Sequence, residues 1–170
     1  MKASRSFGIA LIVIPLVVLS LSSCDTETHE GAGFAISLTE SGERILTDEH
    51  IAAYVWDEHR ILLSTKGVDR WQSFVDFDKS HDPPIRKMGR LTTKEFVVTL
   101  NGVQMYHGHC SSMVSSVANS GVLLYDTLGV PPGEIWMTFT RLDGAPEDDP
   151  RALPDIAAYF RKQGKLRESR

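Results

Sequence analysis

The chain has 170 residues, of which 42% are hydrophobic, and a formal net charge of −4 from 18 basic and 22 acidic side chains. A chain of this length suits one compact domain with a substantial core. Its mild acidity argues against nucleic-acid binding and against attraction to anionic lipid headgroups. With 2 cysteines, a framework of several disulfides is excluded.

The first residues have the layout of a secretory signal peptide. Lys2 and Arg5 precede an apolar run from Phe7 to Leu21. This run is shorter than the roughly 20 apolar residues that a membrane-spanning helix needs. Pro15 also disfavours a continuous helix. A cleaved signal is therefore favoured over a retained membrane span.

The signal ends on Leu21-Ser22-Ser23-Cys24, which resembles the lipobox of bacterial lipoproteins. The resemblance implies cleavage before Cys24 and a diacylglycerol on its sulfur. It also implies a location at the bacterial cell membrane, anchored by lipid on the extracytoplasmic side, which is the periplasmic side in a Gram-negative cell. Removing residues 1–23, with two basic and no acidic side chains, leaves 147 residues and a net charge of about −6.

Polar and small residues at 24–32 are typical of a tether between a lipid anchor and a fold. Alternating apolar residues then predict a strand over Gly33–Leu38. Thr47 is placed to cap a short helical turn over Asp48–Ile51. Two short strands follow at 54–56 and 59–64, on either side of an acidic turn.

From Thr65 the pattern becomes helical, since Val68, Trp71, Phe74 and Val75 share one face. This spacing predicts a helix that runs to about Phe77. A loop is expected over Asp78–Arg90, because Pro83-Pro84 cannot continue a helix.

The next elements form a predicted β-hairpin. Strand-like runs at Glu95–Leu100 and Val103–Cys110 flank Asn101-Gly102, the residue pair most typical of a type I′ turn. Two further strands are predicted at 121–125 and 134–142, and a helix at 154–163 ended by Gly164.

About seven strands and two main helices in segregated order predict an α+β fold with a mostly antiparallel sheet. The expected organisation is a signal peptide (1–23), a tether (24–32), a single domain (33–164) and a basic tail (165–170).

Residues 59–125 resemble the first periplasmic domain of SecD, the translocation accessory subunit. His59–Gly67 leads into the amphipathic helix, and Phe96–Val103 gives a strand, a tight turn and the start of a return strand. The resemblance implies a ferredoxin-like core. A stretch from Ile45 to Leu63 also resembles uncharacterised bacterial lipoproteins with a similar domain. The return strand carries His107-Gly108-His109 where the SecD domain tends to have a proline, and the resemblance concerns fold rather than translocation.

The sharpest candidate for chemistry is Tyr106–Cys110. In a strand, His107 and His109 point to one side and Cys110 to the other. Two imidazoles are fewer than the three or four ligands that zinc or copper sites use. The competing interpretation places both histidines on the sheet surface. With Cys24 lipidated, Cys110 has no partner and is expected to be buried and inert.

Other clusters have ordinary explanations. Asp76, Asp78, His81 and Asp82 are rich in oxygen ligands, but they lack the spacing of an EF-hand and suit a solvated helix end. The acidic run Glu147-Asp148-Asp149 suits a loop that caps the last helix.

Serines 111, 112, 115 and 116 form no nucleophile elbow. The Gly31–Gly33 segment is half of a dinucleotide-binding fingerprint and precedes a strand, so it is assigned to the tether. Tryptophans 56, 71 and 136 are expected in the core or packed on the sheet.

The sequence thus favours a non-enzymatic binding or scaffold domain, attached to the membrane through Cys24 and contacting other envelope proteins. The alternative is a metal-handling lipoprotein that uses His107 and His109. A small hydrolase has the least support, because no nucleophile lies beside a base. No cofactor and no nucleic-acid partner are expected.

Overall fold

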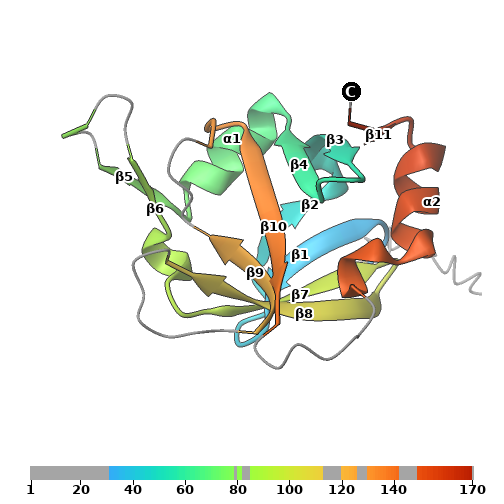
Figure 1. Ribbon diagram of the computed structural model, residues 1–170, viewed down its shortest axis with the longest axis horizontal. Helices are drawn as coiled ribbons and strands as arrows, with labels where there is room; N and C mark the ends of the chain where they lie inside the picture. Colours follow the sequence, from blue (N-terminus) through green and yellow to red (C-terminus); the bar gives the residue numbers. More distant parts are fainter. Residues whose placement is uncertain are drawn as a thin grey trace, which may run out of the picture.

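The computed structural model describes residues 31–78, 80–81, 85–112, 120–125, 130–141 and 149–169 (Figure 1). Cys24 and the signal lie outside these residues. Within these residues there are two α-helices, three short 3-10 helices and eleven strands. The strands are β1 (Phe34–Leu38), β2 (Arg44–Thr47), β3 (Ile51–Val55), β4 (Arg60–Leu63), β5 (Asp76–Asp78), β6 (Ile85–Lys87), β7 (Glu95–Leu100), β8 (Val103–Ser111), β9 (Gly121–Tyr125), β10 (Glu134–Thr140) and β11 (Leu166–Arg167). The helices are η1 (Asp48–His50), α1 (Thr65–Gln72), η2 (Gly89–Leu91), η3 (Pro150–Ala152) and α2 (Pro154–Lys162).

Nine of the strands form one sheet in the order β11-β3-β4-β10-β9-β8-β7-β1-β2, and β5 pairs with β6 in a separate ribbon. All neighbours in the large sheet are antiparallel except β8–β9 and β11–β3. The α+β class with a mostly antiparallel sheet is therefore confirmed. The ferredoxin-like core is not confirmed, since the sheet has nine strands in a mixed order.

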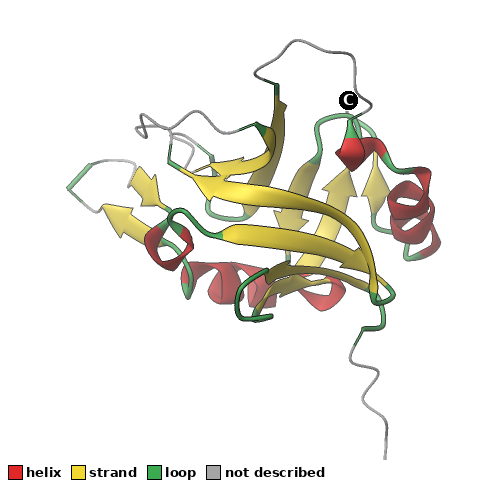
Figure 2. Cartoon of the chain, turned by 90° about the horizontal axis from the view of Figure 1, so that it is seen from below, coloured by secondary structure: helices red, strands yellow, loops and turns green. Residues whose placement is uncertain are grey.

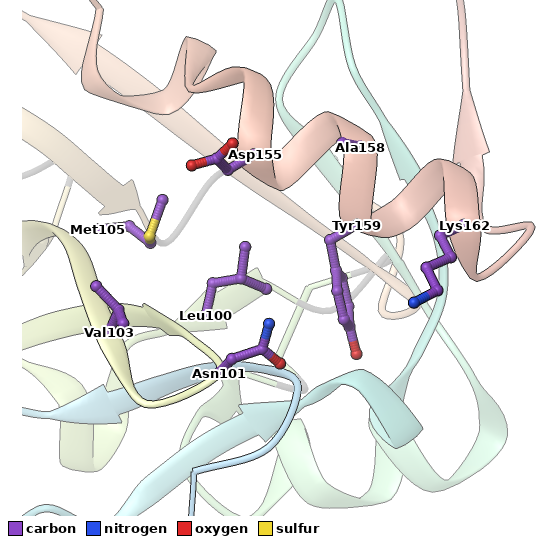
Figure 3. Close-up of a pocket in the computed structure, with 8 residues that line it drawn as sticks. All are labelled: Leu100, Asn101, Val103, Met105, Asp155, Ala158, Tyr159 and Lys162. Atoms are coloured by element: carbon purple, nitrogen blue, oxygen red, sulfur yellow. The ribbon is translucent and has the colours of Figure 1, made fainter.

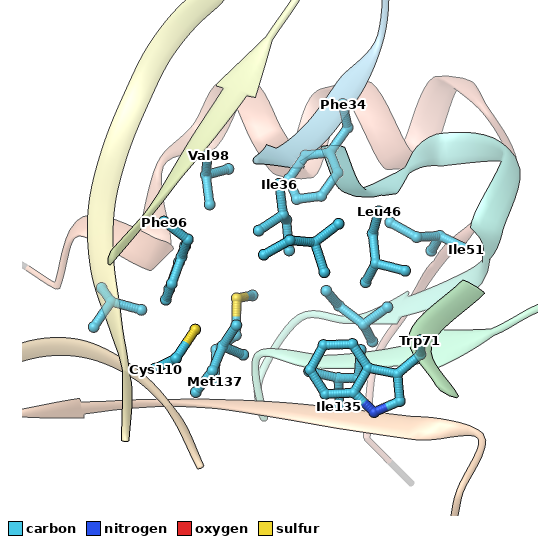
Figure 4. Packing of buried hydrophobic residues seen from close by; sticks show 14 of the residues in the cluster. Phe34, Ile36, Leu46, Ile51, Trp71, Phe96, Val98, Cys110, Ile135 and Met137 are labelled. Atoms are coloured by element: carbon cyan, nitrogen blue, oxygen red, sulfur yellow. The ribbon is translucent and has the colours of Figure 1, made fainter. Parts of the chain in front are cut away.

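The large sheet curves around a single core (Figures 2 and 4). Side chains from strands far apart in the sheet meet there, including Phe34 of β1, Phe96 of β7 and Met137 of β10. Trp71 of α1 closes one side of this cluster and is 1% exposed. Burial of apolar side chains from opposite ends of the sheet is what stabilises its curvature.

The β7–β8 hairpin forms as predicted. Asn101 and Gly102 have φ angles of 51° and 78°, both in the left-handed region that a type I′ turn requires. Leu100 and Val103 pair directly across the turn. The last helix and its end at Gly164, with a φ of 68°, also agree with the sequence.

The predicted extent of the first helix is wrong, because α1 ends at Gln72. Phe74 and Val75 continue the apolar spacing and are buried, yet their N–H groups both bond to the Trp71 carbonyl in a tightening turn. The expected loop also contains structure: Asp76–Asp78 pairs with Ile85–Lys87, and this ribbon projects from the body on the side away from α2 (Figure 1).

Two shorter differences concern the ends of elements. Ile51 opens β3 instead of closing the helical turn. Part of the predicted basic tail is strand β11, which runs parallel to β3. The N–H groups of Tyr54 and Trp56 bond to the carbonyls of Lys165 and Arg167 at 2.8 and 2.9 Å. The ordered fold therefore extends past residue 164.

Candidate functional site

The structure separates His107 and His109 from Cys110 as strand geometry predicts. The Cys110 side chain is buried, whereas His107 is exposed and His109 half-buried. His109 Nδ1 lies 3.8 Å from Glu95 Oε1, and His107 Nε2 lies 2.6 Å from Gln104 Nε2. Burial raises the pKa of the Cys110 thiol to about 12, so the reactive thiolate is strongly disfavoured. Within the described ranges no three His, Cys, Asp or Glu side chains are grouped as metal ligands.

Gly108, between the two histidines, has a packing role. A Cβ atom at Gly108 would lie 2.2 Å from Cζ of Phe96 and 2.6 Å from the carbonyl oxygen of Val122. The absence of a side chain lets the Phe96 ring and the backbone of β9 approach β8. Close packing of β7, β8 and β9 therefore explains the glycine at this position.

Of the candidate oxygen ligands, Asp76 and Asp78 lie in β5 of the β5–β6 ribbon and not at a helix end. Asp78 accepts hydrogen bonds from Ser80 and pairs with Lys87 Nζ at 2.9 Å. These bonds, first from Ser80 and then from Lys87, hold the pKa of Asp78 well below its usual range. His81 Nδ1 is 3.8 Å from Asp78. Asp76 is exposed in β5, and Asp82 lies outside the described residues.

The remaining sequence candidates are dispersed. Asp149 caps the short helix η3, accepting from the Arg151 N–H at 2.9 Å, instead of capping α2 directly. Ser111 is buried in β8 and Ser112 is half-buried. Residues 115, 116, 147 and 148 lie outside the described part of the chain.

The three tryptophans differ in burial. Trp71 is in the core and Trp56 is half-buried against Tyr54, as predicted. Trp136 is 42% exposed on β10. Its packing partner is the Arg60 guanidinium, 5.9 Å from the ring centroid.

A groove of about 460 Å³ lies between α2 and the end of the β7–β8 hairpin (Figure 3). Leu100, Val103 and Met105 supply apolar surface from the hairpin, and Val103 is 64% exposed. The groove is lined by Leu100, Asn101, Val103, Met105, Asp155, Ala158, Tyr159 and Lys162. It combines an apolar floor with polar groups at its margins, as binding surfaces commonly do.

The sequence of α2 explains how it forms one wall. Ile156, Ala157 and Phe160 are buried toward the sheet. The groove residues are 155, 158, 159 and 162, an i, i+3, i+4, i+7 set that shares one helix face. Pro154 at the first position and Asp155 in the first turn suit a helix start. The side chains of Asp155 and Lys162 form no hydrogen bond or ion pair with other described residues, which leaves opposite charges toward the two ends of this face.

Gly33, the residue before β1, lies beside the groove. The Gly33 N–H donates to Asn101 Oδ1 at 3.0 Å, and the Asn101 N–H donates to the Gly33 carbonyl at 2.8 Å. Gly33 has a φ of 87°, and a Cβ there would lie 2.8 Å from Asp48 Oδ2 and 3.0 Å from the Tyr159 hydroxyl. The Tyr159 hydroxyl donates to Asp48. Partial burial, and then this bond, raise the pKa of Tyr159 to about 12.

A second set of polar side chains connects the β3–β4 turn with the residues that precede α2. Tyr54 Oη is 3.1 Å from His59 Nδ1, and His59 Nε2 is 3.7 Å from Asp149 Oδ2. Arg151 Nε donates to Asp149 Oδ1 at 2.9 Å. Burial, followed by the charge of Arg151, lowers the pKa of His59 despite the opposing carboxylates of Asp149 and Asp57.

The sequence predicted neither the groove nor the contact between His59 and Asp149. The exposed face of α2 could be found from its spacing, but not the hairpin it faces. His59 and Asp149 are 90 positions apart and carry no local pattern that links them.

No protein-family model, no curated protein and no solved structure matches this chain. Of the helices that the structure describes, none has the length and hydrophobicity needed to cross a membrane. The groove and its surroundings are therefore interpreted from their own chemistry.

Proposed function

We propose that this protein is a lipid-anchored, extracytoplasmic domain of the bacterial envelope that binds another envelope protein in the groove between α2 and the β7–β8 hairpin. The observation that supports this function best is the junction at Gly33. The segment that leads from Cys24 enters the fold at the rim of the groove, through paired hydrogen bonds to Asn101. A lipid on Cys24 would then be joined to the fold beside the binding surface.

The length of the tether limits how far the groove lies from the membrane. Nine peptide steps separate Cys24 from Gly33, and an extended chain covers at most about 3.6 Å per residue, or about 32 Å in all. A diacylglycerol, with a further acyl chain on the new amino terminus, holds a protein stably, whereas one chain holds it marginally. The groove is then confined near the bilayer surface, where a local concentration effect strengthens even a weak contact.

The shape of the groove suits a protein segment. Sites for small molecules enclose most of their ligand, whereas this groove is open along α2 (Figure 3). An apolar side chain of a partner can lie over Val103 and Met105, between charges that match Asp155 and Lys162. This arrangement of apolar centre and polar rim is that of a protein–protein contact. The role is non-enzymatic and needs no cofactor.

Other expectations from the sequence stay predictions. The stretch behind the SecD resemblance contains β4, α1, the β5–β6 ribbon, η2, β7, the Asn101-Gly102 turn and β8. A ferredoxin-like relationship for this part stays a proposal about fold alone. Metal handling by His107 and His109 also stays a prediction. A third ligand could come from Glu95, whose Oε1 lies 3.8 Å from His109 Nδ1.

Photo-crosslinking in intact cells tests the groove. A photo-reactive amino acid is introduced in turn at Val103 on the hairpin and Ala158 on α2, the two walls of the groove. The matched control is Thr39, an exposed residue directly after β1, at the end of that strand away from Gly33. We expect one shared protein adduct from Val103 and Ala158 and none from Thr39. Equal adducts from all three positions, or different adducts from the two walls, would contradict a binding groove.

A further inference from the structure

We infer that His59 is a pH-sensitive latch that holds α2, and so the wall of the groove, against the sheet at neutral pH and loosens it in mild acid. The inference rests on the proposed function only for the role of the groove. The latch itself is a property of the fold.

The β3–β4 turn brings His59 back over its own hairpin. His59 has a φ of 48°, a left-handed conformation that glycine or asparagine adopts more readily. Its ring contacts Tyr54 and Trp56, with the Trp56 centroid 5.6 Å away. Non-glycine residues in this region persist where their surroundings hold them, and they cluster at functional sites.

The hydrogen bond to Tyr54 depends on a neutral imidazole. Tyr54 is 0% exposed, and within the described residues its hydroxyl has only His59 Nδ1 as a partner, at 3.1 Å. A neutral histidine can accept the hydroxyl proton at Nδ1 and present Nε2–H toward Asp149. A protonated histidine has no acceptor. The Tyr54 proton would then be buried without a partner, which destabilises this arrangement.

The charged groups around His59 act in opposite directions, and burial of the ring is the larger cause that favours its neutral form. Asp149 and Asp57 attract a proton to the ring, and Arg151 repels it. Asp149 is already held by Arg151, which donates to it from both Nε and a terminal nitrogen. The next residue along the chain, Arg60, is directed to Glu58 at 2.8 Å and Glu134 at 3.0 Å.

Two other aromatic residues lie near His59 or near its partner Tyr54. Trp56 lies against the His59 ring from the same turn. Tyr106, from β8, is fully buried beyond Tyr54, and its hydroxyl donates to Met137 Sδ at 3.7 Å.

Two short routes connect His59 to α2. Through Tyr54, the route is a ring stack: the Tyr54 and Phe160 centroids are 4.9 Å apart, with the planes at 1°. Through Asp149, the route is the cap of η3, the short helix that leads into α2. Arg151 fixes η3 to the sheet by donating to the Met137 carbonyl of β10. A shift of Tyr54 or Asp149 therefore moves α2, whose other face lines the groove.

The direction of the pH effect follows from the lowered pKa of His59. Its unperturbed pKa is 6.5, and the folded state binds the proton less readily than the unfolded state. The stabilising contribution is thus complete above 6.5 and is lost as pH falls below that value toward the folded pKa. Outside the cytoplasm a protein experiences the pH of its surroundings, so the latch would respond to external acid.

Hydrogen exchange of the α2 amides, Ile156–Lys162, tests the latch. It is measured on the full-length chain at about pH 7.5 and about pH 5, each corrected for intrinsic exchange. We expect protection in α2 to fall about threefold or more at the lower pH in the natural protein. In His59→Gln the glutamine side chain can accept the Tyr54 hydroxyl hydrogen bond and does not titrate. The protection of the α2 amides should therefore hardly change with pH in this variant. His107→Gln, an exposed histidine on β8, should keep the natural response.

A second variant keeps the test decisive if His59→Gln folds poorly. Tyr54→Phe preserves the ring stack on Phe160 and removes the hydroxyl that needs an acceptor, so the pH response should shrink. Equal protection of α2 at both pH values in the natural protein, or an undiminished response in His59→Gln and Tyr54→Phe, would overturn the latch. The exchange is read without a partner, so its outcome is independent of whether the groove crosslinks to one.

Discussion

Gly33, the residue before β1, contacts the hairpin turn at Asn101 and lies close to Asp48 and Tyr159. It combines a φ of 87° with an approach so close that a Cβ would lie 2.8 Å from Asp48 Oδ2. Only glycine meets both conditions without strain. The close contact between the backbone of Gly33, Asp48 and Tyr159 therefore depends on one missing side chain.

Gly33→Ala should lower the free energy of unfolding by about 3 kcal/mol, since backbone strain and a steric clash both act. Gly42→Ala is the matched control: Gly42 has a φ of 69°, and a Cβ there would meet no atom within 4 Å. It should cost about 1 kcal/mol from the backbone alone. Urea unfolding measures both losses. Similar losses for the two variants would show that Gly33 makes no close contact.

The hairpin element depends on Gly108 in a comparable way. Gly108 lies in β8 where the ring of Phe96 and the carbonyl of Val122 on β9 converge. This position joins β7, β8 and β9, and a side chain there would force the strands apart.

Gly108→Ala should destabilise the protein by about 3 kcal/mol through overpacking. Gly133→Ala provides the comparison, because a Cβ there meets nothing closer than Val68 at 3.8 Å, and it should change stability by no more than about 0.5 kcal/mol. Thermal unfolding followed by circular dichroism measures both variants. A Gly108→Ala protein as stable as the natural chain would refute the packing described for Phe96.

Elements with local signals were predictable from the sequence. The Asn101-Gly102 turn, the alternation along β8 and the cap at Gly164 are each encoded within a few residues. The end of α1 was not predictable, because the buried Phe74 and Val75 continue the helical spacing beyond Gln72. Strand β11 has two residues and exists only because β3 offers it an edge.

In the candidate sites too, local patterns were predictable from the sequence, whereas contacts between distant residues were not. The outward face of α2 is present in the spacing of Asp155, Ala158, Tyr159 and Lys162, but its opposing wall comes from a hairpin about 50 positions away. The contact between His59 and Asp149 depends on tertiary structure alone. Pattern reasoning instead emphasised His107 and His109, whose alternation with Gly108 is ordinary for a strand on a sheet surface.

At the scale of the whole molecule, the curved sheet has two distinct ends. The α2 end carries the groove and the start of β1, and the β5–β6 ribbon projects on the other side (Figure 1). Anchoring at the α2 end would hold the groove near the bilayer and direct the ribbon away from it. This orientation depends on the chain being cleaved and lipidated at Cys24.

Intact-mass analysis of the protein recovered from bacterial membranes tests that claim most directly. We predict a species that lacks residues 1–23, begins at Cys24 and carries the added mass of a diacylglycerol with or without a third acyl chain. Cys24→Ala should instead keep residues 1–23 and gain no lipid. An unmodified Cys24 in the natural protein, or a retained leader, would contradict the account.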